Sequence, residues 1–223
     1  SAKMEYEKSL EFAKKYNDKS SMASAISSIA SLAFANGKNK AALSDFQNAL
    51  KLAQEGGDRN LEAKLWLNVG LAQAKLDLET TADHSLQKAF DIASELGDRK
   101  LIVECCLASA HHNLDEGAKQ NIGKYIAHGL VQSLLVGVKY YVNTLFRTFG
   151  ILQSFIPKHD ARLMAGIVND IIEELKKLER QQVILFVIKS ILLFKAYVNN
   201  KDREPFEDFV KNLARRQFGS RLN

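Results

Sequence analysis

Apolar side chains recur at helical spacing along most of this chain, and the recurrence has a period of about 40 residues, which is typical of stacked helical repeats. Phe46, Ala49, Leu50 and Ala53 are spaced by three, four and seven, which places them on one face of a helix. Steps of one period reach equivalent sets, which are Tyr6, Ser9, Leu10, Ala13, Leu86, Ala89, Phe90, Ala93, Ile126, Gly129, Leu130 and Ser133. The pattern predicts equivalent helices, and the small residues at 9, 49, 89 and 129 predict that a second helix packs closely against each.

A turn signal with the same period follows these helices. Its glycines and aspartates are Gly57, Gly97, Gly137, Asp18, Asp58 and Asp98. The first two glycines suit the left-handed position that ends a helix, and the aspartates that follow them suit the N-cap of the next helix. A fixed period of this length predicts supersecondary units that stack and bury their apolar faces against one another.

The repeat predicts an all-α chain in which antiparallel helix pairs form one continuous domain over residues 1–223. Its approximate units are 1–18, 19–58, 59–98, 99–138, 139–179 and 180–223, of which the first is partial and the last is degenerate. Because Pro157 and Pro205 fit the first turns of helices, the final helices are predicted at 157–178, 181–199 and 204–217. The last of these is predicted to cap the stack.

One unit carries residues that are typical of a known family. Trp66, Val69 and Gly70, followed at the right distances by Ala82, Leu86 and Ala89, resemble the tetratricopeptide repeat. Gln73 stands where that family usually has tyrosine. The resemblance is strong over residues 5–100, fair to about 137 and weak beyond. With its 40-residue units, the chain resembles the longer-repeat subgroup of cell-polarity adaptors and of sensor arms of bacterial regulators. The resemblance implies a right-handed superhelical solenoid with a concave groove that binds peptides.

The first helix of each unit presents two opposite faces. In the unit that begins at 59, Trp66, Val69, Gly70 and Gln73 are expected to face the stack. The opposite face, which the resemblance implies would line the groove, carries Lys64, Asn68, Leu71 and Lys75 in that unit. Equivalent positions elsewhere are Ser24, Ser28, Ser31, Ala35, Glu104, Ala108, His111, Asp115, Thr144, Thr148, Ile151 and Phe155, with Arg147 beside them.

From this face we predict ten partner-binding residues, which are Ser24, Ser28, Ser31, Lys64, Asn68, Leu71, Lys75, Glu104, His111 and Arg147. Two lysines that flank an amide can hold a carboxylate and the backbone of an extended peptide. The alternative interpretation is that these side chains only solvate a helix. The serines either allow a ligand chain to approach closely or form a plain polar surface. Since the first unit offers only serines, the carboxylate clamp that binds chaperone tails is not expected.

No constellation in the sequence supports catalysis. We find no glycine-rich phosphate loop and no nucleophile with an orienting base and acid. His111 and Asp115 share a helix face near Cys105 and Cys106, but a zinc site needs about four converging ligands. We therefore predict a protein that is not an enzyme, with no cofactor, metal or small-molecule substrate. Two adjacent cysteines form no disulfide framework, which favours a cytoplasmic setting.

Charge is unevenly distributed. Residues 1–118 carry a net charge of −3 and residues 119–223 a net charge of +8. A basic half can bind an acidic partner or nucleic acid, but solvated helix faces are the favoured interpretation, so nucleic acid is not expected. The longest apolar stretch, 183–198, contains Lys189 and Lys195, which predicts a buried helix and no membrane span.

These observations favour a scaffold that binds a peptide or protein segment in its groove. A second hypothesis is a regulatory or sensor arm of a longer signalling or transcription-regulating protein, which the start of the chain inside a helical pattern favours. A third is association with an acidic partner or nucleic acid through the basic C-terminal half. A fourth is a homodimer formed by the apolar C-terminal helices, including Phe186, Leu193 and Phe194.

Overall fold

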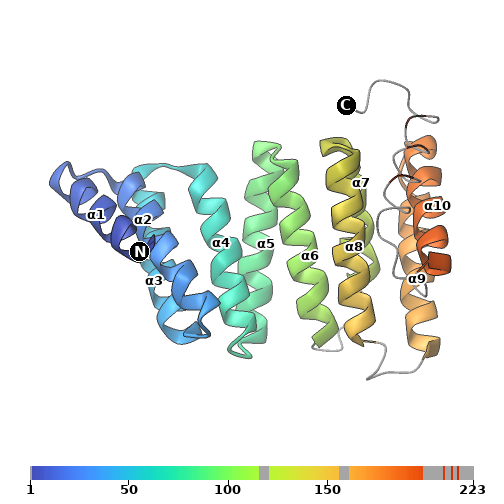
Figure 1. The fold of residues 1–223 in the computed structure, drawn as a ribbon, viewed down its shortest axis with the longest axis horizontal. Coiled ribbons are helices and arrows are strands. Elements are labelled where there is room, and N and C mark those ends of the chain that lie inside the picture. Colours follow the sequence, from blue (N-terminus) through green and yellow to red (C-terminus); the bar gives the residue numbers. More distant parts are fainter. Residues whose placement is uncertain are drawn as a thin grey trace. The chain divides into compact units, whose positions relative to one another are not determined.

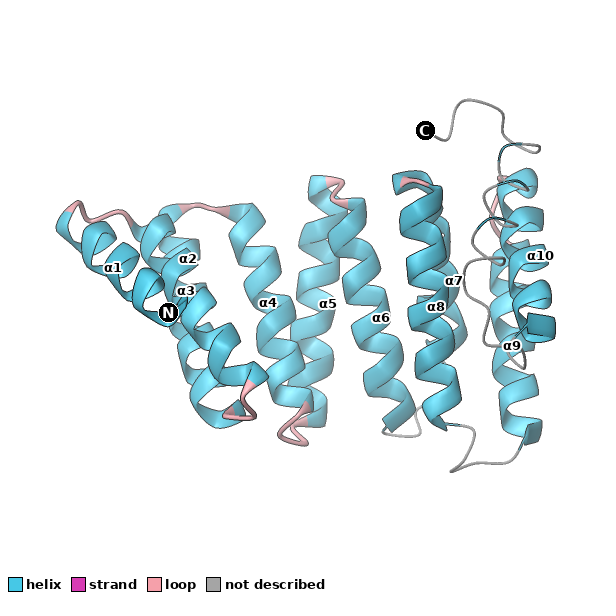
Figure 2. Cartoon of the chain, in the orientation of Figure 1, coloured by secondary structure: helices cyan, strands magenta, loops and turns pink. Residues whose placement is uncertain are grey.

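A computed structural model describes residues 2–115, 121–155 and 161–197, together with residues 208, 212 and 215; side chains at 115, 153–155, 161–165 and 191–197 are not described. Every regular element in these ranges is a helix (Figures 1 and 2). The helices are α1 (Ala2–Lys15), α2 (Lys19–Ala35), α3 (Asn39–Gly56), α4 (Arg59–Ala74), α5 (Glu79–Leu96), α6 (Arg99–Asp115), α7 (Ile122–Val136), α8 (Val138–Phe155), α9 (Ala161–Lys176) and α10 (Gln181–Tyr197). The all-α prediction is therefore confirmed for this part of the chain.

The chain divides into two compact units, Ser1–Leu101 and Ile102–Asn223. Unit 1 contains α1 to α5, and unit 2 contains most of α6 and all of α7 to α10. The prediction of one continuous domain is not tested by this division and stays a prediction.

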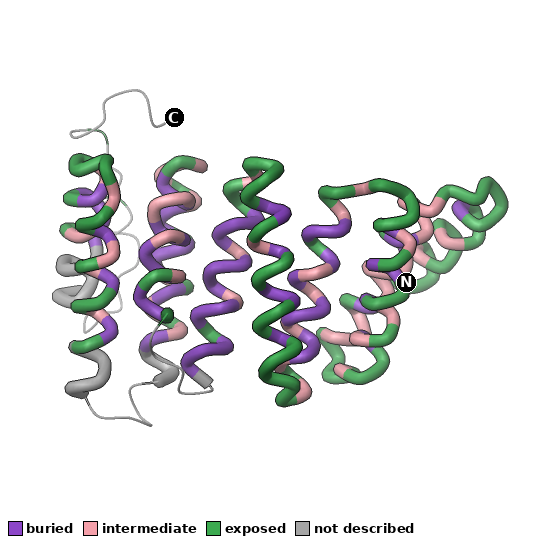
Figure 3. The backbone as a smooth tube through the Cα atoms, turned by 180° about the vertical axis from the view of Figure 1, so that it is seen from behind, coloured by how far each residue is buried: buried purple, intermediate pink, exposed green. Residues whose placement is uncertain are grey.

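Successive helices pack side by side in unit 1, and α2 also contacts α4. Each helix thus buries its apolar face against a neighbour, as the period predicts. The core between α2, α3 and α4 is built from alanines, larger aliphatic side chains and aromatic rings, and Phe34 meets Phe46 edge to face with centroids 6.4 Å apart. Buried and exposed positions alternate along these helices (Figure 3).

The turn that joins one hairpin to the next has the predicted geometry. Gly57 and Gly97 adopt left-handed conformations, with φ of 71° and 68°. The amide after each glycine, on Asp58 or Asp98, donates to a carbonyl five residues earlier at 3.0 Å. Each aspartate then caps the next helix by accepting an amide hydrogen bond from the third residue on, at 3.0 Å for Asp58 and 3.1 Å for Asp98. Asp18 caps α2 in the same way.

A second left-handed position lies inside each hairpin and was missed by the sequence analysis. Gly37 and Asp77, which occupy equivalent positions of the repeat, have φ of 73° and 55°. Asn17 occupies the register of Gly57 and is also left-handed, with φ of 51°. Glycine, asparagine and aspartate tolerate this conformation best, so the repeat is present in the backbone geometry of unit 1 as well as in its side chains.

Close approach of helices depends on small residues at the predicted positions. Ala49 and Ala89 are fully buried, and a Cβ added to Gly70 of α4 would lie 2.8 Å from Leu86 Cδ2 of α5. Ser9, the equivalent residue of α1, is exposed. The expectation of close packing at Ser9 is therefore wrong, because no described helix covers this side of α1.

In unit 2, α7 lies at the centre, since it contacts α8, α9 and α10. Gly129 allows α7 to approach Cys106 of α6, and Gly123 allows it to approach Asp170 of α9. Gly137 continues the glycine register, but its φ and ψ of 148° and 157° differ from those of Gly97. This backbone region is almost exclusive to glycine. α8 begins at the next residue, without the aspartate cap of the earlier turns.

The C-terminal predictions have mixed outcomes. α9 covers 161–176 of the predicted helix 157–178, of which 157–160 lie outside the described residues, and α10 begins at Gln181 as expected. Most of 204–217 lies outside the described residues. Phe186 is fully buried, with its ring 5.4 Å from that of Tyr141. It is therefore a core residue and not part of an exposed self-association surface. No described helix has the length and apolarity required to cross a bilayer.

Replacing Gly57 with alanine should lower the free energy of unfolding by about 1–2 kcal/mol, because a Cβ is strained in the left-handed conformation. The control is Gly150→Ala in α8, where an added Cβ meets nothing within 4 Å. Alanine there should be neutral or stabilise by up to about 1 kcal/mol, because it is the better helix former. Urea denaturation followed by circular dichroism measures both. A neutral Gly57→Ala would show that the turn conformation does not constrain the hairpins.

Gln73 accepts a hydrogen bond of 2.7 Å from the Ser85 hydroxyl, and both side chains are buried between α4 and α5. Ser85→Ala should lower the free energy of unfolding by about 1–3 kcal/mol, since it leaves the Gln73 oxygen unsatisfied. Ser94→Ala on the exposed side of α5 removes a hydroxyl that bonds only its own helix and should change stability by less than about 0.5 kcal/mol. Equal effects of the two substitutions in urea denaturation would contradict this account.

Candidate functional site

The two faces of α4 are as predicted. Val69, Gly70 and Gln73 are buried against neighbouring helices. On the other side, Lys64 and Lys75 are exposed, beside the half-buried Asn68 and Leu71. Trp66 packs against the core and meets His84 edge to face, with centroids 6.2 Å apart. We call Lys64, Asn68, Leu71 and Lys75 the α4 outward face.

The equivalent side of α2 presents three serines, of which Ser28 and Ser31 donate their hydroxyl protons within the helix. Ser24 and Ser31 are exposed and Ser28 is half-buried. Ser28 donates to the Ser24 carbonyl at 3.0 Å, and Ser31 donates to the Ser27 carbonyl at 2.8 Å. Serine side chains are short, so this surface has no long projecting groups. Because hydroxyls bonded to their own helix have no proton left to donate, acceptor oxygens outnumber available donors on it. This surface suits close approach of a chain better than strong hydrogen bonding.

The two lysines of the α4 outward face differ from Lys19 and Arg59, the cations that join helices of unit 1, in having no ion pair among the described residues. Lys19 lies 3.0 Å from Glu55, and Arg59 pairs with both Glu62 and Glu95. Neither Lys64 nor Lys75 has an ion-pair partner within the described ranges. Their charges are therefore available to a ligand, whereas those of Lys19 and Arg59 hold helices together.

A buried carboxylate fixes the start of α4 and was not found from the sequence. Glu62 is 8% exposed. Gln54 donates to its Oε1 at 3.1 Å and Arg59 donates to its Oε2 at 2.9 Å. Burial opposes its ionisation, but the hydrogen bonds from Gln54, Arg59 and Trp66, with the charge of Arg59, outweigh burial and lower its pKa. Arg59 also donates to Glu95 at 2.6 Å, so the cluster joins α3, α4 and α5.

The sequence contains a signal for this cluster. Lys19 and Glu55 have the same separation along the chain as Arg59 and Glu95, and each pair joins the two ends of one hairpin. An opposite-charge spacing that recurs with the repeat indicates a structural pair. This signal identifies Lys19 and Arg59 as structural cations from the sequence alone.

In unit 2, two of the predicted partner-binding residues bind each other. Arg147 of α8 donates two hydrogen bonds to the Glu104 carboxylate of α6, at 2.6 and 2.7 Å, and the Tyr140 hydroxyl lies 3.3 Å from the same carboxylate. The hydrogen bond with Glu104 raises the pKa of Arg147. A bidentate pair of this kind neutralises both charges. Neither side chain is therefore a free charge for a ligand.

The predicted outward face of α8 is wrong at Thr144 and Thr148. These side chains are only 1% and 2% exposed, whereas Asn143 and Arg147 are exposed. α8 follows Gly137 directly, and the backbone of Gly137 differs from the left-handed turn at Gly97. We attribute the different rotation of α8 about its axis to this turn, since the prediction assumed that α8 follows a turn like those of the earlier repeats.

The residues around the predicted groove positions of the repeat 99–138 form no metal site and no nucleophile site. His111 is exposed, Ala108 is half-buried, and Cys105 and Cys106 are fully buried. Burial raises the pKa of the Cys106 thiol, which disfavours a reactive thiolate. Within the described residues no three His, Cys, Asp or Glu side chains are placed to hold a metal ion.

A shallow pocket of about 340 Å³ lies elsewhere in unit 1, between α3 and the turn that joins α4 to α5. It is lined by Lys40, Leu43, Ser44, Gln47, Leu76 and Leu78. None of these residues was predicted to bind a partner, and none belongs to the α4 outward face.

No protein-family model matches the chain, and no curated protein matches it significantly. The assignment of a function therefore depends on the residues and their geometry.

The pH dependence of stability tests the Glu62 cluster. Because the pKa of Glu62 is lower in the folded state than in the unfolded chain, its ionised form stabilises the fold at neutral pH. This contribution should be lost as pH falls below about 4.3 and through the folded-state pKa. The Glu62→Gln variant should lose less stability over the same range in urea titrations. Glu79→Gln, which changes an exposed carboxylate of α5, should keep the wild-type pH dependence. If Glu62→Gln also kept it, the cluster would not be ionised as described.

Proposed function

We propose that the helix pairs form a right-handed solenoid of tetratricopeptide type. Three observations from unit 1 support this. The left-handed turn positions and N-caps recur with the period of the sequence repeat. The first helices of adjacent hairpins, α2 and α4, contact each other, as stacking requires. The residues that resemble the family motif, including Val69, Gly70 and Leu86, are buried at helix contacts.

We further propose that the chain is a non-enzymatic scaffold that binds an extended, acidic segment of a partner protein along the outward sides of α2 and α4. The observation that carries this proposal is the pair of unpaired lysines, Lys64 and Lys75, on either side of Asn68 and Leu71. A cationic surface with a central amide fits a peptide better than it fits an apolar ligand.

Each residue type has a distinct part in this binding. The lysine ammonium groups donate to ligand carboxylates. The Asn68 amide can both donate to and accept from a peptide backbone, which suits it to hold an extended chain. Leu71 offers apolar contact beside it, and the serines of α2 leave room for the ligand chain. Ser24, Ser28 and Ser31 are thus expected to contribute shape more than charge.

The spacing of the lysines sets the spacing of the ligand's acids. Lys64 and Lys75 are eleven residues apart on the helix and its C-cap, which corresponds to about 16 Å along the axis. An extended peptide advances about 3.3 Å per residue. The proposed segment therefore carries two acidic groups about five residues apart.

The other hypotheses gain less from the structure. Arg147, Lys176 and Lys177 of the basic half each pair with a glutamate, which reduces the charge available to nucleic acid. A regulatory arm would use the same α4 outward face, so this hypothesis differs in what binding causes and not in where it occurs.

The test is fluorescence anisotropy with labelled peptides that carry two glutamates at different separations. The wild-type chain should bind best when the glutamates are about five residues apart. The Lys64→Glu/Lys75→Glu variant should bind at least about 100-fold more weakly, since two charge-assisted contacts become repulsive.

Lys51→Glu/Lys88→Glu is the matched control, because it makes the same charge change on exposed residues of α3 and α5. It should keep most of the affinity, and thermal denaturation should show both variants folded. Equal losses in the two double variants would reduce the effect to net charge and contradict a site on α4.

A further inference from the structure

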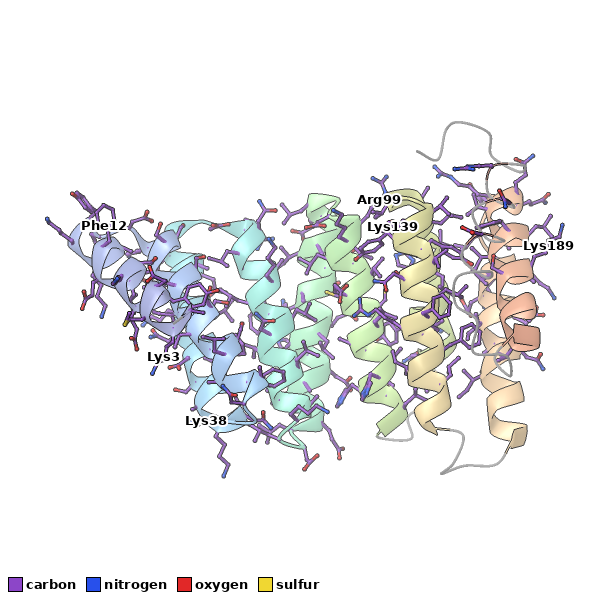
Figure 4. All side chains as sticks on the ribbon, in the orientation of Figure 1. Lys3, Phe12, Lys38, Arg99, Lys139 and Lys189 are labelled. Atoms are coloured by element: carbon purple, nitrogen blue, oxygen red, sulfur yellow. The ribbon has the colours of Figure 1, made fainter. Side chains whose placement is uncertain are left out.

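Two aromatic rings stand exposed at the end of α1, Phe12 in the helix and Tyr16 in the turn that follows it. Phe12 and Tyr16 are 66% and 62% exposed, and their ring centroids are 4.8 Å apart. Phe12 projects from α1 in Figure 4. Helical spacing places both rings on one face with Ser9 and Glu5, which we call the α1 aromatic face. Aromatic side chains of this kind are enriched where proteins contact each other.

The register of the repeat shows what such a face receives. The equivalent residues of α5 are Ser85, Ala89, Ile92 and Leu96. Ser85 donates a hydrogen bond to Gln73 of α4, and the adjoining Leu86 packs on Gly70 of the same helix. Ile92 is almost fully buried. This side of α5 therefore packs against an antiparallel helix from Ser85 to Ile92, whereas Leu96 is 40% exposed. No described helix lies against the same side of α1.

We propose that a second copy of this chain supplies that helix, so that two α1 helices pack antiparallel about a two-fold axis. The face is self-complementary in shape. In the register that places Phe12 over the small Ser9 of the other copy, symmetry places the other Phe12 over Ser9 in return. A large side chain over a small one is what lets two helices approach closely.

The same register is complementary in charge. It places Glu5 against Tyr16 of the other copy, whose hydroxyl can donate to the carboxylate. Lys15 Nζ lies 5.8 Å from the centroid of the Tyr16 ring. In this register its positive charge therefore also lies near Glu5 of the other copy. The present partner of Glu5 is Lys8 at 3.6 Å, with side chains that are 65% exposed for Lys8 and 67% exposed for Glu5. Such a surface pair is weak and is readily exchanged. Antiparallel helix dipoles add to the attraction.

Sedimentation equilibrium tests the proposal. The mass of the wild-type chain should rise from 24.9 kDa towards that of a dimer between micromolar and millimolar concentration. Phe12→Ser should weaken dimerisation at least about tenfold, because the largest apolar contact is lost. Leu78→Ser is the control, since it removes an apolar side chain that is 45% exposed elsewhere in unit 1, and it should not change the dissociation constant.

A charge exchange tests the register. Glu5→Lys and Lys15→Glu should each weaken the dimer, because each brings like charges together, and the double variant should restore it. A Ser9→Cys chain should cross-link to a dimer with a short bismaleimide, whereas Glu7→Cys, on the opposite side of α1, should not. The native Cys105 and Cys106 are fully buried and should not react.

Three outcomes would overturn the proposal. They are a mass of 24.9 kDa at every concentration, equal sensitivity to Phe12→Ser and Leu78→Ser, and equal cross-linking from positions 7 and 9. Circular dichroism should show that every variant is folded, since the changed side chains are exposed. The α1 aromatic face does not include Lys64 or Lys75, so peptide binding and dimerisation succeed or fail independently.

Discussion

The left-handed backbone positions between helices are the constraint on which unit 1 depends. One such residue follows each helix from α1 to α5, and these residues are Asn17, Gly37, Gly57, Asp77 and Gly97. Because the turns recur at a fixed interval, every hairpin reverses direction with the same geometry. Equivalent side chains then meet equivalent neighbours, and small residues such as Ala49 and Ala89 fall where helices approach most closely.

This regularity gives some charged residues of unit 1 a structural partner. Cations at the start of the first helix of a hairpin meet acids at the end of the second, as Lys19 meets Glu55 and Arg59 meets Glu95. They contribute to the fold, although exposed pairs of this kind stabilise it only modestly. Lys64 and Lys75 lie on the side of α4 that no described helix covers, so no acidic side chain pairs with them there. The proposed ligand therefore follows from position in the repeat and not from net charge, which is negative in this half.

Sequence patterns predicted those features that depend on local geometry. Helical periodicity and capping residues located the α3 to α4 turn, the buried side of α4 and its outward lysines. They failed where the outcome depended on a change of turn or on a distant partner. Thr144 and Thr148 became buried because Gly137 lacks the earlier turn geometry, although it keeps the register as a residue type. The Glu104 pair with Arg147 joins two helices across a long stretch of sequence, which no pattern within one helix reveals. Phe186 fitted both a buried helix and a self-association surface, because apolar content cannot distinguish a core helix from an exposed one.

A helical repeat produces faces that its own helices do not always fill. A helix in such a stack has one side for the other helix of its hairpin and another for the next hairpin. Where both are filled, as for α4, only the third side remains for a ligand. On α1 the side that α5 uses to receive α4 carries Phe12 and Tyr16 instead of the aliphatic residues Ile92 and Leu96. Aromatic rings have large apolar area, and tyrosine adds a polar hydroxyl, so they suit a contact that forms and separates in water better than a permanent core does. That difference in residue type, at an equivalent position, supports the proposed association surface.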